Sequence, residues 1–245
     1  MAVISAALLP VFLLLLYIWW KDTHREPVAW LLLAFLSGGA LLYPAIWLEA
    51  EIEGLVFSPS FMPAGAIGVL TDALVATAIP EEGLKLLALL LILRWNPHYD
   101  EHIDGIVYAV FIGLGFAGAE NIIYLQGDDH WVTTAAVRSL LAVPGHYAFA
   151  VIMGYYYSMY AFVERTAKHA LSTFAVPVTT HAAYDSLAMS GQVHPYAGLV
   201  CFFLLIAFCL RMHWMARKRI LILIGKDCDN GAARPPGSKE EHATG

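Results

Sequence analysis

The stretch "IPEEGLKL" (residues 79–86) places two adjacent glutamates and a lysine inside an otherwise apolar part of the chain. The flanking segments, "AGAIGVLTDALVATA" (64–78) and "LALLLILRW" (87–95), have the composition of two halves of a membrane-spanning helix. A charged side chain at the centre of a spanning helix costs about 2.5–3.5 kcal/mol on insertion scales, so such residues normally face a bundle interior and serve a function. The fold prediction and the site prediction therefore start from the same eight residues.

The composition of the whole chain is that of a membrane protein. Of its 245 residues, 59% are hydrophobic and 14% are charged, and the mean hydropathy is +0.64. Soluble domains carry about 25% charged residues. Runs long enough to cross a bilayer cover residues 2–20, 28–48, 64–94, 105–126, 132–163, 170–190 and 196–215. We therefore predict an all-α fold, a polytopic transmembrane helical bundle.

Two of these runs, 64–94 and 132–163, are too long for one straight span. Proline interrupts helices because it lacks a backbone N–H, and the two runs contain Pro80 and Pro144. We expect breaks near these prolines and seven to eight spans in total.

Basic residues predict the orientation of the bundle. They fall in alternate connections, at Lys21, Arg25, Arg94, Arg165, Lys168 and the cluster 211–226. By the positive-inside rule, the N-terminus lies outside and the C-terminus is cytoplasmic. We expect one helical domain over residues 1–225 and a disordered cytoplasmic tail over 226–245, which is rich in Gly, Pro and charge. Nothing in the sequence indicates nucleic-acid binding.

Few ionisable residues lie inside the predicted spans, and several share one depth. They are Asp72, Glu81, Glu82, Lys85, Glu120, Arg138, His146, His181 and Asp185. With the topology above, acids and histidines from four separate segments reach a similar level, from the middle to the outer half of the membrane. We therefore expect these segments to form one polar site.

The spacing within the segments supports this site. Lys85 lies four residues after Glu81 and three after Glu82, so it can neutralise one of them on a shared helix face. Asp185 lies four residues after His181 and can orient its imidazole. Four ionised acids and one lysine would leave a buried charge of −3, which requires shared protons or a divalent cation. Two histidines with glutamates match the ligands of a zinc site with an open position for water.

The same residues reproduce a family signature. "EEGLK" (81–85), "FAGAEN" (116–121) and "HAAYD" (181–185) follow the patterns EExxK, FxxxE and HxxxD. The chain resembles the PrsW family of intramembrane proteases, distant relatives of the CAAX prenyl endopeptidases. The resemblance covers about residues 65–190 and is especially close over 104–124. It implies an intramembrane endopeptidase in the cytoplasmic membrane of a prokaryote.

The resemblance also implies roles for individual residues. Glu81 becomes the candidate base that activates water, and Glu82 a second acid or a ligand. Glu120 stands where the prenyl endopeptidases carry a histidine and follows the PrsW pattern. His181 becomes a ligand or a partner of the water, with Asp185 supporting it. The implied partners are the lipid bilayer and a membrane-anchored protein substrate, such as an anti-sigma factor, cut near the outer leaflet.

Other roles rest on depth and chemistry. His146 belongs to the site by depth and residue type, which makes Glu120, His146, His181 and Asp185 the candidate metal ligands. Lys85 or Asn121 is a candidate for stabilising the oxyanion. Zinc-assisted hydrolysis and direct activation of water by glutamate and histidine both stay open.

Two readings from other functional classes compete with hydrolysis. A proton- or ion-coupled transporter also uses broken helices and carboxylates at membrane depth, although the chain shows no matching broken segment in a second half. A non-catalytic member of the family would bind other membrane proteins without cutting them.

Overall fold

The computed structural model describes residues 1–56, 65–192 and 195–233, and within these ranges the chain forms helices and no strand. The α-helices are α1 (Ala2–Lys21), α2 (Val28–Ala40), α3 (Leu42–Val56), α4 (Ala66–Thr71), α5 (Ile79–Trp95), α6 (Asp104–Leu125), α7 (Trp131–Leu140), α8 (Ala142–Ser158), α9 (Ala167–Met189) and α10 (Pro195–Ala233). The π-helical segments η1 (Asp72–Ala78) and η2 (Met159–Val163) and the short 3₁₀ turn η3 (Ser190–Gln192) complete the described part. The predicted all-α class is confirmed.

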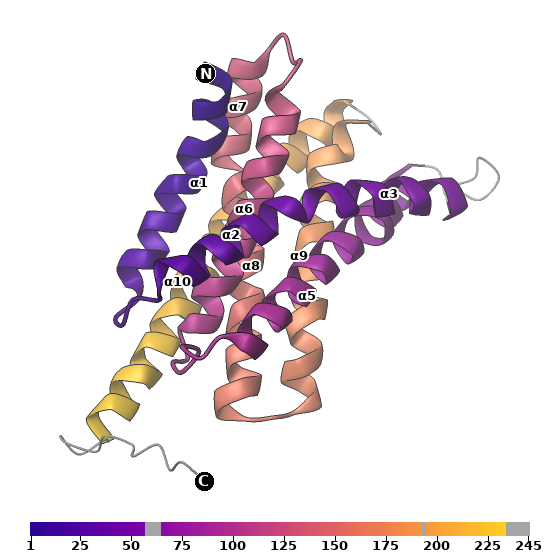
Figure 1. Ribbon diagram of the computed structural model, residues 1–245. Helices are drawn as coiled ribbons and strands as arrows, with labels where there is room; N and C mark the ends of the chain where they lie inside the picture. Colours follow the sequence, from indigo (N-terminus) through magenta and orange to yellow (C-terminus); the bar gives the residue numbers. More distant parts are fainter. Residues whose placement is uncertain (57–64, 193–194, 234–245) are drawn as a thin grey trace.

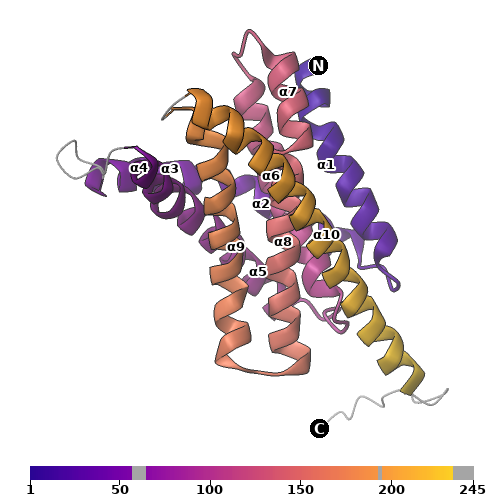
Figure 2. The same cartoon turned by 180° about the vertical axis from the view of Figure 1, so that it is seen from behind.

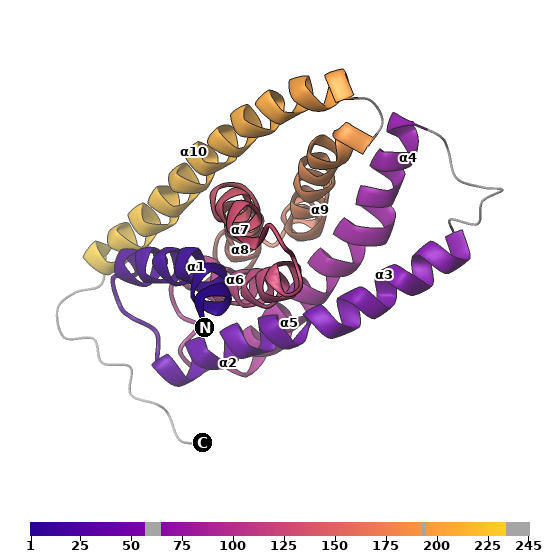
Figure 3. The same ribbon diagram turned by 90° about the horizontal axis from the view of Figure 1, so that it is seen from above.

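Helix α6 forms the centre of the bundle. In the most apolar stretch of α6, 78% of the residues are buried inside the protein. In the corresponding stretch of α1, the share is 17%. Seen from above, α6 and α8 lie inside a ring that contains α1, α2, α5, α9 and α10 (Figure 3). The core is aliphatic and aromatic, with Tyr108, Phe116 and Ile112 of α6 almost fully buried. A helix buried on all sides can carry polar residues at fixed positions without exposing them to lipid.

Glycines allow α2 and α6 to approach closely. A Cβ atom placed on Gly38 of α2 would lie 2.0 Å from the carbonyl oxygen of Ile112, and one on Gly115 of α6 would lie 2.0 Å from that of Phe35. Small residues at such crossings let membrane helices pack backbone to backbone. The two glycines therefore fix the distance between α2 and α6.

We expect Gly115→Ala to destabilise the bundle by about 1–3 kcal/mol or more, because overpacking against a backbone atom forces the helices apart. Reversible unfolding in mixed micelles measures this loss. The matched control is Gly225→Ala in α10, where a Cβ would meet nothing within 4 Å. An equal effect of the two substitutions would contradict the role assigned to Gly115.

Five helical stretches are long and apolar enough to cross a membrane. They are Ala2–Lys21, Val28–Leu55, Asp104–Leu125, Trp131–Val163 and Gly198–Asp229. The protein is thus a multi-pass membrane protein, and the count of seven to eight spans stays a prediction. The two remaining predicted runs, 64–94 and 170–190, are helical over most of their described residues but are not among these five stretches.

The two long runs are interrupted near the predicted prolines. Before Pro80, the π-helical segment η1 leads directly into α5. The second break lies at Leu141, whose φ of −121° and ψ of −57° separate α7 from α8, and Pro144 follows in the first turn of α8. Proline tolerates the first turn of a helix because no hydrogen bond from its nitrogen is needed there.

The connections separate into two groups at opposite ends of the bundle. The α1–α2, α5–α6 and α8–α9 connections and the end of α10 lie toward the bottom of Figure 1, and the N-terminus and the α6–α7 connection lie at the top. Figure 2, the view from behind, shows α10 crossing in front of α8 between the two ends. The arrangement groups the connections that carry the basic residues, and the orientation itself remains a prediction.

Helix α10 extends beyond the predicted end of the helical domain. It continues to Ala233, so the boundary expected at residue 225 falls inside a helix. There Asp227 accepts hydrogen bonds from the backbone N–H groups of His102 (2.8 Å) and Ile103 (3.0 Å). The start of the expected tail is therefore tied to the α5–α6 connection, and residues 234–245 lie outside the described ranges.

Candidate functional site

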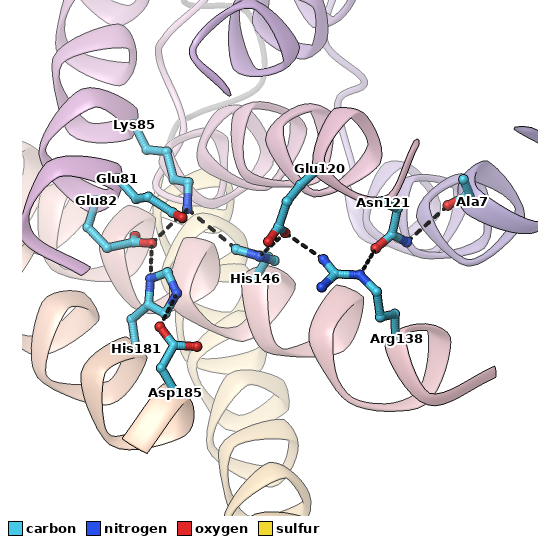
Figure 4. A network of polar contacts seen from close by, with 10 residues as sticks. All are labelled: Ala7, Glu81, Glu82, Lys85, Glu120, Asn121, Arg138, His146, His181 and Asp185. Carbon is cyan, nitrogen blue, oxygen red and sulfur yellow. Dashed lines mark hydrogen bonds and ion pairs between the residues drawn. The ribbon is translucent and has the colours of Figure 1, made fainter. Parts of the chain in front are cut away.

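Side chains from α5, α6, α8 and α9 meet in one polar network between the helices (Figure 4). Seven of the eight residues proposed from the sequence are linked directly: Glu81, Glu82, Lys85, Glu120, His146, His181 and Asp185. The eighth, Asn121, is joined through Arg138.

The local structure around Pro80 presents two glutamates of α5 to this network. Pro80 cannot donate a backbone hydrogen bond, and the wider turns of η1 come immediately before it. Glu81 and Glu82 lie in the first turn of α5, immediately after this π-helical segment. Such π-helical irregularities are frequent at functional sites.

Lys85 holds the two glutamates together. Its Nζ donates to Glu81 Oε2 and to Glu82 Oε1, both at 2.9 Å, and lies 3.4 Å from His146 Nδ1. The ammonium group also lies 4.0 Å from the centre of the Phe116 ring. Lys85 is only 4% exposed, so its charge is compensated by the glutamates rather than by water.

His146 of α8 is oriented by a carboxylate of α6. Its Nε2 lies 2.9 Å from Glu120 Oε2, which is also 2.7 Å from Nη2 of Arg138. With the Nε2 proton donated to Glu120, the Nδ1 lone pair faces Lys85 Nζ and can accept from it. Carboxylates commonly orient catalytic and metal-binding histidines in this way.

His181 of α9 contacts two carboxylates. Its Nδ1 lies 2.9 Å from Glu82 Oε1, and its Nε2 lies 3.2 Å from Asp185 Oδ2. The imidazole also stacks on Phe149, with ring centres 4.7 Å apart. Like His146, it directs Nδ1 toward the α5 side chains and Nε2 toward an orienting carboxylate.

Asn121 points away from the other proposed residues. Its amide Nδ2 donates to the carbonyl oxygen of Ala7 in α1 at 3.2 Å, and its Oδ1 accepts from Nε of Arg138 at 2.7 Å. Both ends of the amide are therefore used in packing α1 and α7 against α6. This placement gives no support to the predicted oxyanion role of Asn121.

A cavity of about 580 Å³ opens beside the network. Its polar and aromatic lining includes Glu49, Glu53, Asp72, Glu81, Glu120, Tyr124, Arg138, His146, His181, Tyr184 and Asp185. Glu82 and Lys85 do not line it, so among the α5 acids only Glu81 reaches the space where a substrate can bind.

Sequence reasoning missed part of this lining. Glu49 and Glu53 follow the predicted span 28–48, but both lie on α3 and face the cavity. Their spacing of four residues was the available signal for a shared helix face. Arg138 was left without a function, and the structure gives it contacts with Glu120 and Asn121.

The network retains an excess of negative charge. The carboxylates of Glu81, Glu82, Glu120 and Asp185 face the cations of Lys85 and Arg138. With neutral imidazoles the formal charge is −2, less negative than the value from the sequence because Arg138 joins the site. Shared protons or a bound cation would balance this remainder.

The donor atoms fit a metal ion. Glu81, His146 and His181 each offer one ligand atom, these atoms lie within 4.8 Å of one another, and all three residues are buried. Two histidines and one glutamate form a ligand set of catalytic zinc sites. Glu120 and Asp185, proposed as ligands from the sequence, instead contact the outer Nε2 atoms of the two histidines.

The sequence pattern of one family covers most of the chain. The pattern of the PrsW family of intramembrane metalloproteases matches residues 26–210, so the chain belongs to this family of proteases. The resemblance noted from three motifs is thereby confirmed.

Individual relatives agree with this assignment. Protease PrsW of Bacillus subtilis is 36% identical over 203 residues, which is 79% of this chain and 86% of that protein. Protease PrsW of Geobacillus kaustophilus is 32% identical over 224 residues, covering 89% of this chain and 91% of that protein. Protease PrsW of Clostridioides difficile is 30% identical over 190 residues, or 75% and 77% of the two chains. No solved structure matches the chain.

Proposed function

We propose that the chain hydrolyses a peptide bond of a membrane-anchored protein, such as an anti-sigma factor, at the cavity beside Glu81. The observation that supports this most is the set of two carboxylate-oriented histidines and one glutamate at the wall of a cavity between membrane helices. The family of proteases to which the chain belongs favours hydrolysis over the transporter reading.

Glu81 is the proposed base. It lines the cavity, and Lys85 donates to its Oε2. Glu81 takes a proton from the water as the water oxygen attacks the carbonyl carbon of the peptide bond. The C–N bond then breaks while the amine nitrogen receives that proton. General bases of this kind contribute about 10²–10⁴-fold to the rate.

Arg138 is the proposed partner of the developing oxyanion. Arg138 lines the cavity, whereas Lys85 is enclosed between the two glutamates behind it. A positioned positive charge stabilises the tetrahedral intermediate more than the ground state. This proposal replaces the role that the sequence suggested for Lys85 or Asn121.

Zinc assistance is the second part of the proposal. His146, His181 and Glu81 would hold the ion, and Glu120 and Asp185 would orient the histidines. A zinc ion bound there would lower the pKa of a water ligand and polarise the carbonyl group. If Glu81 serves as a ligand, the proton transfer falls to Glu120, which lines the same cavity.

The site lies in one half of the bundle. Glu120 is five residues from the end of α6, at the end where the N-terminus also lies (Figure 1). Together with the predicted orientation, this depth supports cleavage near the outer leaflet. The acidic lining around Glu49 and Asp72 supports entry of the substrate from the same side.

The testing experiment combines cleavage and metal content. The purified chain, in vesicles with a single-span reporter, is expected to release a product cut near the outer leaflet, and to carry one zinc ion by mass spectrometry. Asp185→Asn should lower zinc affinity or activity by about 10–100-fold, as loss of an orienting partner typically does.

Asp129→Asn, in an exposed loop, is the matched control and should leave both values unchanged. No product with any reporter would contradict the proposed hydrolysis. Product without stoichiometric metal would contradict only the zinc part.

A further inference from the structure

A second cluster of carboxylates lies at the other end of α6. It consists of Asp22 and Glu26 in the α1–α2 connection, Glu101 in the α5–α6 connection, and Asp104 at the first residue of α6. One carboxylate oxygen from each of Asp22, Glu101 and Asp104 lies within 4.8 Å of the other two. These groups take no part in the proposed hydrolysis.

Each of these three carboxylates is held by one oxygen and leaves the other free. Asp22 Oδ2 accepts from the backbone N–H of Glu26 at 3.1 Å. Asp104 Oδ2 accepts from the backbone N–H groups of Asp100 and Glu101 at 3.0 and 2.7 Å. The remaining oxygens, Asp22 Oδ1, Glu101 Oε2 and Asp104 Oδ1, are buried and have no hydrogen-bond partner.

The unpartnered oxygens are well removed from solvent. Asp104 is fully buried and Asp22 is 4% exposed. A buried carboxylate oxygen without a partner costs free energy, and buried polar groups in native proteins nearly always have one. Three such oxygens, on carboxylates that each bring one oxygen within 4.8 Å of the other two, point to a bound cation.

Neighbouring charged groups do not supply that cation. Lys21 and Arg25 lie over the rings of Trp20 and Trp19, with their charges 5.0 and 4.1 Å from the ring centres. Within the described residues, no lysine or arginine forms an ion pair with the four carboxylates.

The histidines and the tyrosine nearby are engaged at other atoms. His24 contacts Glu101 Oε1, and His102 pairs with Asp227. The Tyr108 hydroxyl donates to Glu26 Oε2. None of these contacts reaches the three unpartnered oxygens, Asp22 Oδ1, Glu101 Oε2 and Asp104 Oδ1.

We propose that Asp22, Glu101 and Asp104 bind a hard divalent cation of the Mg²⁺ and Mn²⁺ class. The free donors are all carboxylate oxygens, which suit Mg²⁺ and Mn²⁺ and not the nitrogen and sulfur preferences of zinc. Mg²⁺ binds through a small number of carboxylates and keeps several waters. Glu26 lies beside the three ligands and adds negative charge.

This site is separate from the proposed hydrolytic site. Asp104 and Glu120 are sixteen residues apart on one straight helix, which is ~24 Å at 1.5 Å per residue. The cation ties the α1–α2 connection to the start of α6. The proposed role is therefore to hold the helix ends together and not to take part in peptide hydrolysis.

Titration of the full-length purified chain with Mn²⁺, followed by electron paramagnetic resonance, tests the proposal. We expect one saturable Mn²⁺ site per chain that excess Mg²⁺ competes for. Glu101→Gln and Asp104→Asn should each weaken Mn²⁺ binding at least tenfold. Asp129→Asn should leave it unchanged, and so should His181→Ala, which alters the hydrolytic site.

Glu101→Gln keeps the test decisive if Asp104→Asn does not fold, because Glu101 is only partly buried and glutamine preserves its volume. Mn²⁺ binding that is equal in Glu101→Gln and the unaltered chain would overturn the proposal. Absence of saturable binding in the unaltered chain would also overturn it, and would mean that protons neutralise the carboxylates.

Discussion

Glu81→Gln is expected to lower the rate of substrate cleavage by about 10²–10⁴-fold, the usual contribution of a general base. Glutamine keeps the size of the side chain and can still accept a hydrogen bond from Lys85, but it cannot take a proton from water. Cleavage of the single-span reporter in vesicles measures the change. A matched control is Glu51→Gln, which alters an exposed glutamate of α3.

The same variant distinguishes the two roles of Glu81. If Glu81 is the base, the Glu81→Gln variant keeps the zinc content of the unaltered chain but loses activity. If Glu81 is a ligand, zinc and activity are lost together, and Glu120→Gln becomes the test of proton transfer. Cleavage at the normal rate by Glu81→Gln would remove Glu81 from the mechanism altogether.

Lys85→Met is expected to destabilise the protein by about 3–5 kcal/mol, because removal of one partner of a buried ion pair leaves an uncompensated charge. Here two glutamates, 5% and 1% exposed, lose their shared cation at once. Reversible unfolding in mixed micelles measures the loss. Lys168→Met, at an exposed position of α9, is the matched control and should change stability little.

A second substitution makes the test of Lys85 specific. Adding Glu82→Gln to Lys85→Met removes one of the two uncompensated charges and should recover part of the lost stability. The stability effects of substitutions within one ion-pair network are not additive. A loss below about 1 kcal/mol for Lys85→Met, the level of an exposed pair, would mean that shared protons rather than Lys85 neutralise the glutamates.

The fold class could be predicted because hydropathy has a direct physical cause. Long apolar runs must form helices in a bilayer, where each backbone polar group needs an internal partner. Pro80 and Pro144 marked the interruptions for a similar reason, since proline lacks an N–H donor. The close crossing of α2 and α6 at Gly38 and Gly115 could not be predicted, because it depends on which helices become neighbours.

The candidate site was predictable where ionisable residues lie in apolar surroundings. Glu81, Lys85 and His181 stood out because charged and titratable groups are costly inside a membrane. Their partners were harder to assign, since spacing along one helix does not show which way a side chain points. Asn121 was expected at the site and packs against α1, whereas Glu49 lies outside the predicted spans and lines the cavity.

The central position of α6 has a consequence for how the protein is made. Helices α1 and α2 precede α6 in the chain, but α7 and α8, which supply Arg138 and His146, are synthesised after it. Until they arrive, Glu120 has neither of these partners. A nascent chain halted before residue 131 should therefore hold α6 loosely and be open to degradation, so quality control of this protein depends on the arrival of its second half.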